Sequence, residues 1–243
     1  MPFAVPPAIT TRKPIFTPGM KVNWEHPLNR ELAAWWLMNE GSGDGTIRDL
    51  VSGIVASPAG GYPTWQGSPR GICLNFAAAP YLTIPILDKL NIVGPITIVA
   101  WIYRSSTANG YIFYGNDTSN PYKGYTMGIG IGGTANCITY WNGVGWKSST
   151  TTISTLAWHN IGVSGKGTTV QFALDGLDAG TQTLAEPTTW SGIRAIGGRS
   201  NDGNTPFNGL IADVRLYRVG FSVTNFQTEY IYPYGTPDNP RLI

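Results

Sequence analysis

Charged residues are scarce in this chain. They make up 12% of its 243 residues, with 16 Lys and Arg against 14 Asp and Glu, so the formal net charge is only +2. Globular domains usually carry about 25% charged residues. No run of Lys or Arg occurs, whereas proteins that bind nucleic acid or anionic membrane surfaces gather such residues on one face. The composition therefore argues against both partners, and also against a coiled coil or a charge-driven disordered chain.

Cysteine and histidine are also rare. Cys73 and Cys137 each lie in an apolar stretch, which favours two buried free thiols. One disulfide between them stays open, because spacing alone does not decide pairing. The only histidines are His26 and His159, and no CxxC pair occurs, so the sequence argues against a zinc site.

A long apolar run is missing as well. The most apolar window, residues 92–103, is interrupted by Gly94, Pro95 and Thr97, and it is too short to cross a bilayer. A signal peptide has a basic stretch ahead of an apolar one, and the first residues of this chain have no such pattern. We therefore expect no membrane insertion and a protein that is made and assembled in the cytoplasm.

Glycine, proline and aromatic residues are plentiful instead, with 31 Gly, 18 Pro and 12% aromatics. Short β-branched and aromatic stretches alternate with turn residues, and Asp175-Gly176 is a strong tight-turn signal. Only residues 222–230 predict a helix, with Ser222 as its N-cap. This pattern predicts an all-β fold in which two antiparallel sheets form a sandwich. The predicted strands cover residues 33–38, 81–84, 96–103, 111–114, 125–129, 138–141, 160–164, 169–174, 194–197 and 209–217.

The chain divides into three predicted parts: an extended arm at residues 1–30, the sandwich at residues 31–232 and a C-terminal tail at residues 233–243. Prolines in the arm fix the backbone and remove N–H donors, which favours extended geometry. Such an arm is either a flexible tail or a segment that lies on a partner subunit. The residues that would make the partner contact are Pro6, Pro7, Pro14, Phe16 and Trp24.

Six motifs occur in an order that resembles laminin-G-like, concanavalin A-like jelly rolls. The resemblance extends over residues 32–230 and implies a jelly-roll sandwich of that type. It departs from the family pattern after Leu74-Asn75-Phe76, where the usual Asp-Gly turn is Ala77-Ala78. The motifs are L-A-A-W-W-L-M-N-E-G-S-G at 32–43, R-D-L-V-S-G at 48–53, I-T-I-V-A-W-I at 96–102, W-H-N-I-G-V at 158–163, V-Q-F-A-L-D-G at 170–176 and F-N-G-L-I-A-D-V-R-L-Y at 207–217.

Two shorter phrases resemble proteins of tailed bacteriophages. V-N-W-E-H-P-L at 22–28 is similar to a W-x-H-P-L phrase that precedes the first jelly-roll strand in those proteins, and Y-I-Y-P-Y at 230–234 is similar to their L-Y-x-x-P ending. This resemblance implies a virion protein, most simply a decoration protein on the capsid surface. Its partners would be the major capsid protein or other virion proteins, and a partner-binding arm would make it a homo-oligomer.

Residues that could carry out catalysis do not form a recognisable pattern. A laminarinase-type glycanase holds two carboxyls about 5 Å apart on an E-x-D-x-E strand, and the five Glu residues here are scattered. The G-x-S-x-G elbow is incomplete at Ser164, and G-x-G-x-x-G at 128–133 leads into a predicted strand and hairpin rather than a helix. We expect His159 to pack or to hydrogen-bond at the start of a strand. The sequence therefore predicts no catalytic residue, and a glycan-cleaving enzyme is the weakest alternative.

Sugar binding is a common activity of the family that the chain resembles, so host glycans are an alternative partner. Aromatic faces stack on pyranose rings, and amide side chains hold hydroxyls. The alternative interpretation is that most of these aromatics belong to the core or to a subunit contact. The candidate sugar-binding residues are Tyr122, Tyr125, Tyr140, Trp141, Trp146, Asn116 and Asn142.

The same resemblance implies one candidate cofactor, a structural calcium ion between the first and last strands. Calcium takes about six to eight oxygen ligands. Asp213 matches the acidic position of the family's final strand, and Glu40 and Asp49 are candidate neighbours. Asp213 would otherwise pair with Arg215 or Arg48, or cap a turn. The leading hypothesis is thus a non-enzymatic virion protein that requires no cofactor, and the alternative is a carbohydrate-binding adhesin on a phage particle.

Overall fold

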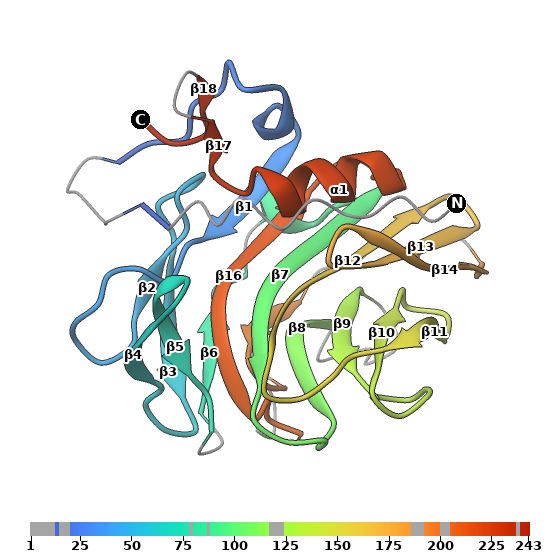
Figure 1. Ribbon diagram of the computed structural model, residues 1–243, viewed down its shortest axis with the longest axis horizontal. Helices are drawn as coiled ribbons and strands as arrows, with labels where there is room; N and C mark the ends of the chain where they lie inside the picture. Colours follow the sequence, from blue (N-terminus) through green and yellow to red (C-terminus); the bar gives the residue numbers. More distant parts are fainter. Residues whose placement is uncertain are drawn as a thin grey trace.

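The computed structural model describes residues 13–14, 20–77, 80–86, 88–116, 124–185, 192–199, 205–236 and 239–243. Two antiparallel sheets lie face to face and enclose a hydrophobic core (Figure 1). This arrangement confirms the predicted jelly-roll sandwich. Among the described residues, no helix has the length and apolarity needed to cross a membrane.

The first sheet has the strand order β14-β13-β12-β7-β16-β5-β4, and β1 pairs with β16 beside this path. Its strands are β1 (Leu32–Trp36), β4 (Thr64–Ser68), β5 (Gly71–Asn75), β7 (Ile96–Arg104), β12 (Trp158–Lys166), β13 (Thr169–Leu174), β14 (Leu177–Thr183) and β16 (Gly209–Tyr217).

The second sheet has the strand order β11-β10-β9-β8-β15-β6-β3-β2, and a short pair, β17 with β18, lies near the C-terminus. Its strands are β2 (Ile47–Arg48), β3 (Val55–Ala59), β6 (Tyr81–Ile84), β8 (Gly110–Asn116), β9 (Thr126–Ile129), β10 (Cys137–Trp141), β11 (Trp146–Thr152) and β15 (Ile193–Ile196). The short pair comprises β17 (Gly235–Thr236) and β18 (Asn239–Pro240).

Strand β7 shows how the sequence builds the sandwich. Side chains alternate between the two faces of a strand. Ile98 and Ile102 therefore point into the core between the sheets, while Val99 and Trp101 point to the outer face of the first sheet. That outer face carries apolar residues too, so it needs a cover of its own.

The strands that the sequence pattern missed are short or lie near sheet edges. β11 and β14 each lie at one edge, and their sequences are dominated by Ser, Thr, Gln and other polar residues. An edge strand with few buried side chains lacks the apolar alternation that identifies a strand. All the predicted strands are present, with bounds that shift by a few residues. Asp175 and Gly176 form the predicted tight turn, and both have positive φ angles.

Helix α1 (Val223–Ile231) covers part of the outer face of the first sheet. Ser222 is its N-cap, as predicted, and Asn225 completes a capping box: the Ser222 Oγ accepts from the Asn225 N–H, and the Asn225 side chain accepts from the Ser222 N–H. Phe226 reaches the sheet at Gly162, where an added Cβ would lie 2.3 Å from its ring. The absence of a side chain at Gly162 therefore lets α1 approach closely.

Four charged side chains form a buried group that we call the ion cluster. Asp213 and Arg215 come from β16, Glu229 from α1 and Arg241 from the C-terminal segment. Arg215 lies 2.7 Å from Asp213 and 2.6 Å from Glu229, and Arg241 lies 2.6 Å from the same Glu229 oxygen. None of the four is more than 1% exposed. Two positive and two negative charges meet, so their formal charges cancel inside the protein.

Aromatic side chains surround the ion cluster. The Tyr217 hydroxyl donates to Glu229, and the Tyr234 hydroxyl donates to Asp213 at 3.1 Å. The guanidinium groups of Arg215 and Arg241 lie 4.2 Å and 5.1 Å from the centre of the Trp35 ring, within the range of cation–π attraction. Burial opposes ionisation of Glu229, but the two guanidinium groups, Arg241 first, bring its pKa below the usual value. The charges are thus paired as well as buried.

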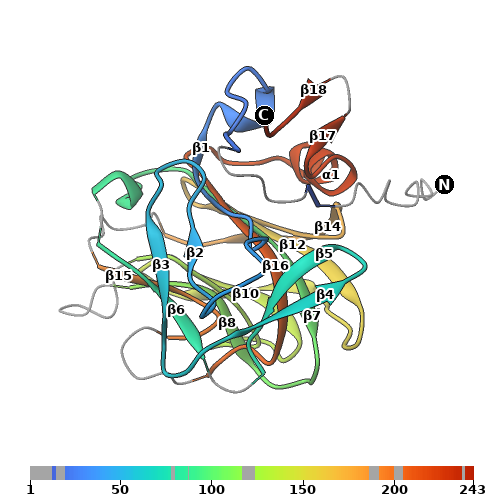
Figure 2. The same ribbon diagram turned by 90° about the vertical axis from the view of Figure 1, so that its left-hand side faces the viewer.

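The segments near both chain ends lie together beside α1 (Figure 2). Val22 bridges to Leu242, and the Lys21 N–H donates to the Ile243 carbonyl at 2.7 Å. The buried Asn29, at the end of the short 3-10 helix η1 (Pro27–Asn29), donates to the Arg241 carbonyl at 2.8 Å. The described parts of the predicted arm and tail therefore pack on the sandwich.

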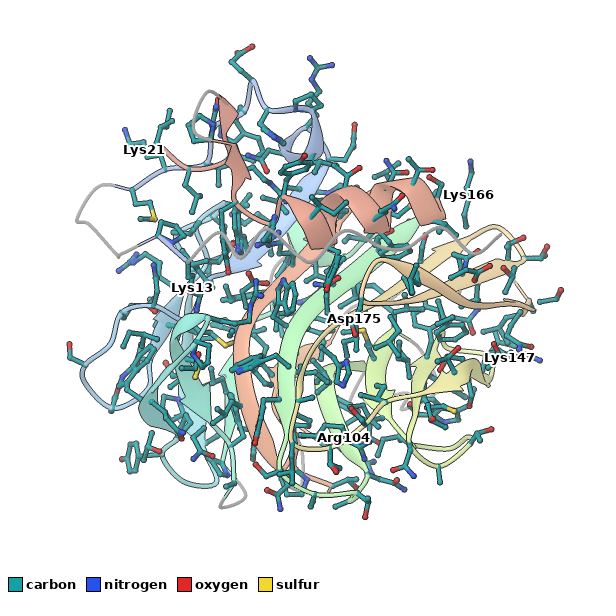
Figure 3. The ribbon with its side chains drawn as sticks, in the orientation of Figure 1. Lys13, Lys21, Arg104, Lys147, Lys166 and Asp175 are labelled. Carbon is teal, nitrogen blue, oxygen red and sulfur yellow. The ribbon has the colours of Figure 1, made fainter. Side chains whose placement is uncertain are left out.

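Lys13, labelled in Figure 3, contacts the chain's own first sheet. Its Nζ donates to the carbonyl oxygens of Met38 at 2.9 Å and Ile72 at 2.7 Å, and burial lowers its pKa to about 7. The Pro14 carbonyl accepts from Asn39 at 3.1 Å. Among the other predicted contact residues of the arm, Trp24 is 48% exposed. Pro6, Pro7 and Phe16 lie outside the described residues, and the division into arm, sandwich and tail stays a prediction.

We expect Glu229→Gln to destabilise the protein by about 3–5 kcal/mol, because a buried ion pair that loses one partner leaves uncompensated charge. Urea unfolding followed by tryptophan fluorescence measures this change. Glu31 is exposed, so Glu31→Gln is the matched control and should stay within about 0.5 kcal/mol of the original chain. Equal stability of the two variants would show that the ion cluster does not hold the fold together.

Candidate functional site

The predicted aromatic residues are divided between the core and the surface. Tyr125 and Tyr140 point into the core, at 3% and 1% exposure. Tyr125 donates to the Leu90 carbonyl at 2.6 Å, and burial raises its pKa to about 12. Neither ring is available to a surface ligand, which agrees with the alternative interpretation of these two residues as core.

Trp141 and Trp146 lie on the outer face of the second sheet. They are direct partners across β10 and β11, and their rings lie 5.5 Å apart at an angle of 43°. Both are half-buried. The Trp146 ring packs on the backbone of Gly132, where an added Cβ would lie 2.6 Å from the ring. This close approach to backbone holds Trp146 in place while it keeps part of the ring exposed.

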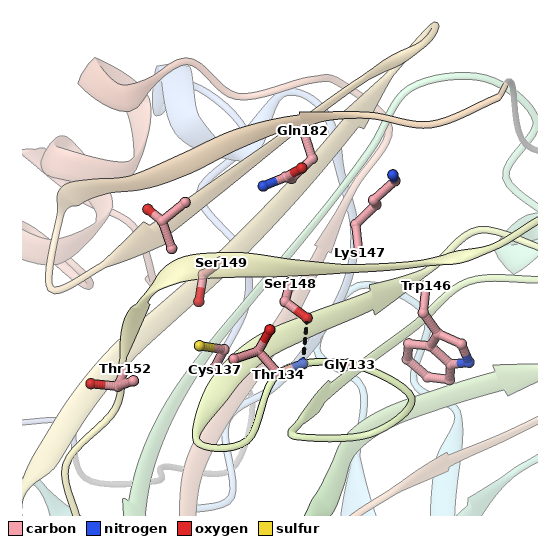
Figure 4. A pocket seen from close by; sticks show the side chains of 10 residues that line it. Gly133, Thr134, Cys137, Trp146, Lys147, Ser148, Ser149, Thr152 and Gln182 are labelled. Carbon is pink, nitrogen blue, oxygen red and sulfur yellow. Dashed lines mark hydrogen bonds between the residues drawn. The ribbon is translucent and has the colours of Figure 1, made fainter.

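A pocket of about 580 Å³ opens beside Trp146, where β11 faces β14 of the first sheet (Figure 4). The Thr150 hydroxyl joins these two strands by donating to the Ala179 carbonyl at 3.1 Å. Most of the lining side chains carry hydroxyl, amide or ammonium groups. The lining residues are Gly133, Thr134, Cys137, Trp146, Lys147, Ser148, Ser149, Thr150, Thr152 and Gln182.

Lys147 and Gln182 approach the pocket from opposite strands, β11 and β14 (Figure 4). Within the described part of the chain, no hydrogen bond or ion pair engages either side chain. The Ser148 hydroxyl accepts from the Thr134 N–H at 3.0 Å and keeps its own proton free to donate. The pocket thus combines one partly exposed indole with several free polar groups.

Sequence reasoning identified Trp146 but missed the other side chains of this pocket. Residues 148–152 read Ser-Ser-Thr-Thr-Thr, a polar run that gave no strand signal. Asn142, which was predicted as a sugar ligand, is 3% exposed and donates to the Ala185 carbonyl at 2.6 Å. Tyr122 and the side chain of Asn116 lie outside the described residues.

The three carboxylates predicted for calcium all bond to donors of the protein itself. Asp213 belongs to the ion cluster with Arg215, one of the two pairings that the sequence left open. Asp49 is buried and accepts from the N–H groups of Trp35, Val51 and Ser52. Glu40 accepts from the N–H groups of Asn39 and Arg48. Among the described residues, no group of three or more His, Cys, Asp or Glu could hold a metal ion. These carboxylates do not fit a shared calcium site, and a bound calcium ion stays a prediction.

Ser154, His159 and Asp175 form a chain of hydrogen bonds at one rim of the sandwich. The Ser154 Oγ lies 2.7 Å from His159 Nε2, and His159 Nδ1 lies 2.7 Å from Asp175. Asp175 also accepts from the Asn160 N–H at 2.8 Å. The expectation that His159 hydrogen-bonds at the start of a strand is confirmed. A hydroxyl, an imidazole and a carboxylate also occur in this order in a hydrolase triad. The same hydrogen bonds have a structural effect, because they connect the loop before β12 to the turn after β13.

Several solved structures share this fold. Domain 4 of AbnA, a GH43 extracellular arabinanase from Geobacillus stearothermophilus in complex with arabinotriose, matches with a TM-score of 0.62 and 15% identity over 81% of this chain and 97% of that one. Botulinum neurotoxin type C, whose cell entry depends on two ganglioside molecules, matches with a TM-score of 0.60 and 14% identity over 84% of this chain and 51% of that one. Trypanosoma rangeli sialidase in complex with sialic acid gives a TM-score of 0.60 and 12% identity over 83% and 33%.

At these identities the structural likeness is one of fold. No curated protein sequence matches the chain. A family model does match, over residues 76–225, which is more than half of the chain. That segment runs from the end of β5 to the first turn of α1 and includes most of both sheets. The chain belongs to the concanavalin A-like lectin/glucanases superfamily.

Proposed function

We propose that this domain binds carbohydrate in the pocket beside Trp146 and releases it chemically unchanged. The observation that supports this function best is the combination of a partly exposed indole with free hydroxyl, amide and ammonium groups in one pocket. An indole face suits the C–H surface of a pyranose, and the polar groups suit its hydroxyls. A pocket of about 580 Å³ is large enough for a short saccharide.

The structural neighbours support the same class of ligand. The arabinanase domain was solved with arabinotriose and the sialidase with sialic acid, and the neurotoxin depends on gangliosides. These ligands are chemically diverse, so the neighbours do not select one sugar for this chain. The sugar-specific groups here would be Lys147 and Gln182, because they meet the pocket from different strands.

We expect Trp146→Ala to weaken glycan binding by at least about tenfold, which corresponds to about 1.4 kcal/mol, because the stacking surface is lost. A glycan array identifies a ligand for the original chain, and titration calorimetry compares the variants. Gln182→Ala should weaken the binding of the same ligand without disturbing the Trp146 ring. Trp24→Ala removes an exposed indole that is not among the residues lining the pocket, so this variant is the control and should bind as the original chain does. Unchanged affinity in Trp146→Ala would rule out this pocket.

We propose that the Ser154–His159–Asp175 chain is structural and that the protein is not an enzyme. The His159 side chain is only 13% exposed. Ser154 and Asp175, at the two ends of this series of hydrogen bonds, each connect a loop to β12. A fluorophosphonate probe, which labels activated serine nucleophiles, should therefore leave Ser154 unmodified after hours at neutral pH. Mass spectrometry of the tryptic peptide reads this out, and Ser154→Ala is the blank. Stoichiometric labelling that disappears in His159→Ala would identify a serine hydrolase instead.

We also propose that the protein works on the surface of a bacteriophage particle, most simply as a capsid decoration protein. The supporting observation is that the two phage-like phrases, residues 22–28 and 230–234, contribute to one hydrophobic cluster, which contains Val22 and Tyr234. Tyr234 stacks on Trp35 of the same cluster, with ring centres 6.4 Å apart. The two segments that resemble phage proteins, one near each end of the sequence, are thus part of the same packed region of the structure.

Quantitative mass spectrometry of purified particles that encode this chain tests the virion proposal. We expect a high, fixed number of copies relative to the major capsid protein, because a decoration protein follows the symmetry of the shell. A few copies per particle would favour a receptor-binding role at the tail instead. Absence from the particles would remove the virion proposal and leave a free carbohydrate-binding protein.

A further inference from the structure

A strip of apolar side chains lies on the outer face of the first sheet, around the end of α1. We call it the aromatic strip, and its members are Trp101, Tyr103, Trp158, Leu210 and Tyr230. The rings of Trp101 and Tyr230 stack 5.6 Å apart, and those of Tyr103 and Trp158 lie 5.8 Å apart. The strip crosses β16, β7 and β12, and three of its four rings are only partly buried.

Two buried donors in the strip lack acceptors. The guanidinium carbon of Arg70, beside the strip, lies over the Trp101 ring, 3.2 Å from the ring centre, and the two residues are 8% and 3% exposed. Within the described residues, neither Arg70 Nε nor Trp101 Nε1 has a hydrogen-bond partner. An unsatisfied buried donor costs about 1–3 kcal/mol. A ligand for this surface should therefore offer apolar contact and free carbonyl oxygens.

Lys13 reaches the same surface at its β5 edge. A Cβ added to Gly71 would lie 3.1 Å from the Cβ of Lys13, so this lysine lies directly on the start of β5. Its ammonium is close enough to Cys73 and Arg70 to interact with them electrostatically. The chain that precedes Lys13 therefore starts at the edge of the aromatic strip.

We propose that residues 1–12 bind along the aromatic strip of their own domain. This segment contains Pro2, Pro6 and Pro7, is otherwise mostly apolar and has no acidic residue. Proline has a carbonyl but no N–H, so the segment is rich in acceptors for the two unpaired donors. Extended proline-rich peptides bind between aromatic rings at low entropic cost, because they are already ordered.

The segment is long enough for this path. Three strand spacings separate β5 from β12, which is about 14 Å. Trp158 is in register with Asn75, four residues along β5 from Gly71, which adds about 13 Å along the strand direction and makes the diagonal about 19 Å. An extended proline-rich chain advances about 3.1 Å per residue, so about six residues cover this distance and place Pro7, next to Ala8, near Trp158.

A fluorescent label at position 8 tests the proposal in the full chain. Cys73 and Cys137 are buried and free, so bimane reacts selectively with the cysteine of Ala8→Cys. Contact with an indole quenches bimane. We expect the folded protein to be severalfold dimmer than the same protein in urea. Trp158→Phe should restore most of the brightness, because the quencher is lost and the strip stays aromatic. Pro6→Ser combined with Pro7→Ser should also brighten the label, without touching the folded domain.

Trp24→Phe is the matched control, because Trp24 is exposed and lies outside the strip. It should leave the label quenched. A label that is equally bright in the folded and unfolded chains would overturn the proposal. Quenching that disappears on dilution, together with an oligomer in light scattering, would also overturn it, because the segment would then lie on a second copy of the chain.

Discussion

The pairing of two carboxylates with two guanidinium groups under α1 is the constraint on which the rest of this structure depends. Asp213 and Arg215 belong to the last long strand, Glu229 to the helix and Arg241 to the C-terminal segment. Removing such charges from water is costly, and the cost is offset only where each charge meets a charge of opposite sign. The cluster can therefore form only when strand, helix and terminal segment are all in position, which makes the position of each depend on the others.

The outer faces of the two sheets differ in what covers them. The outer face of the first sheet carries α1, residues 20–30 and the C-terminal residues, so the chain covers most of that face itself. The outer face of the second sheet keeps Trp141 and Trp146 partly exposed, next to the polar pocket at the rim. The residues that line this pocket include none of the ion cluster, so the proposed binding site is separate from the charges under α1.

The sequence predicted the fold well because the central strands alternate and the family motifs fall on them. It predicted the residues of the candidate site poorly, for a physical reason. Tyr140 and Trp141 are neighbours on one strand, and strand geometry sends the first into the core and the second to the surface. The polar residues of β11 and β14 form a pocket only because two sheet edges meet, a contact between distant segments that no local pattern contains. Asp213 matched a calcium position, but its partner Arg215 lies two residues away on the same face of the strand.

Hydrogen exchange of the unmodified protein tests the central claim most directly, because it measures the opening free energy of each segment separately. The ion cluster joins α1, residues 20–30 and residues 239–243 to β16. Amides in all four segments should therefore have protection factors within about tenfold of one another, equivalent to about 1.4 kcal/mol. Residues 20–30 and 239–243 that exchange several orders of magnitude faster than β16 would contradict the account, because the chain ends would then open independently of the cluster.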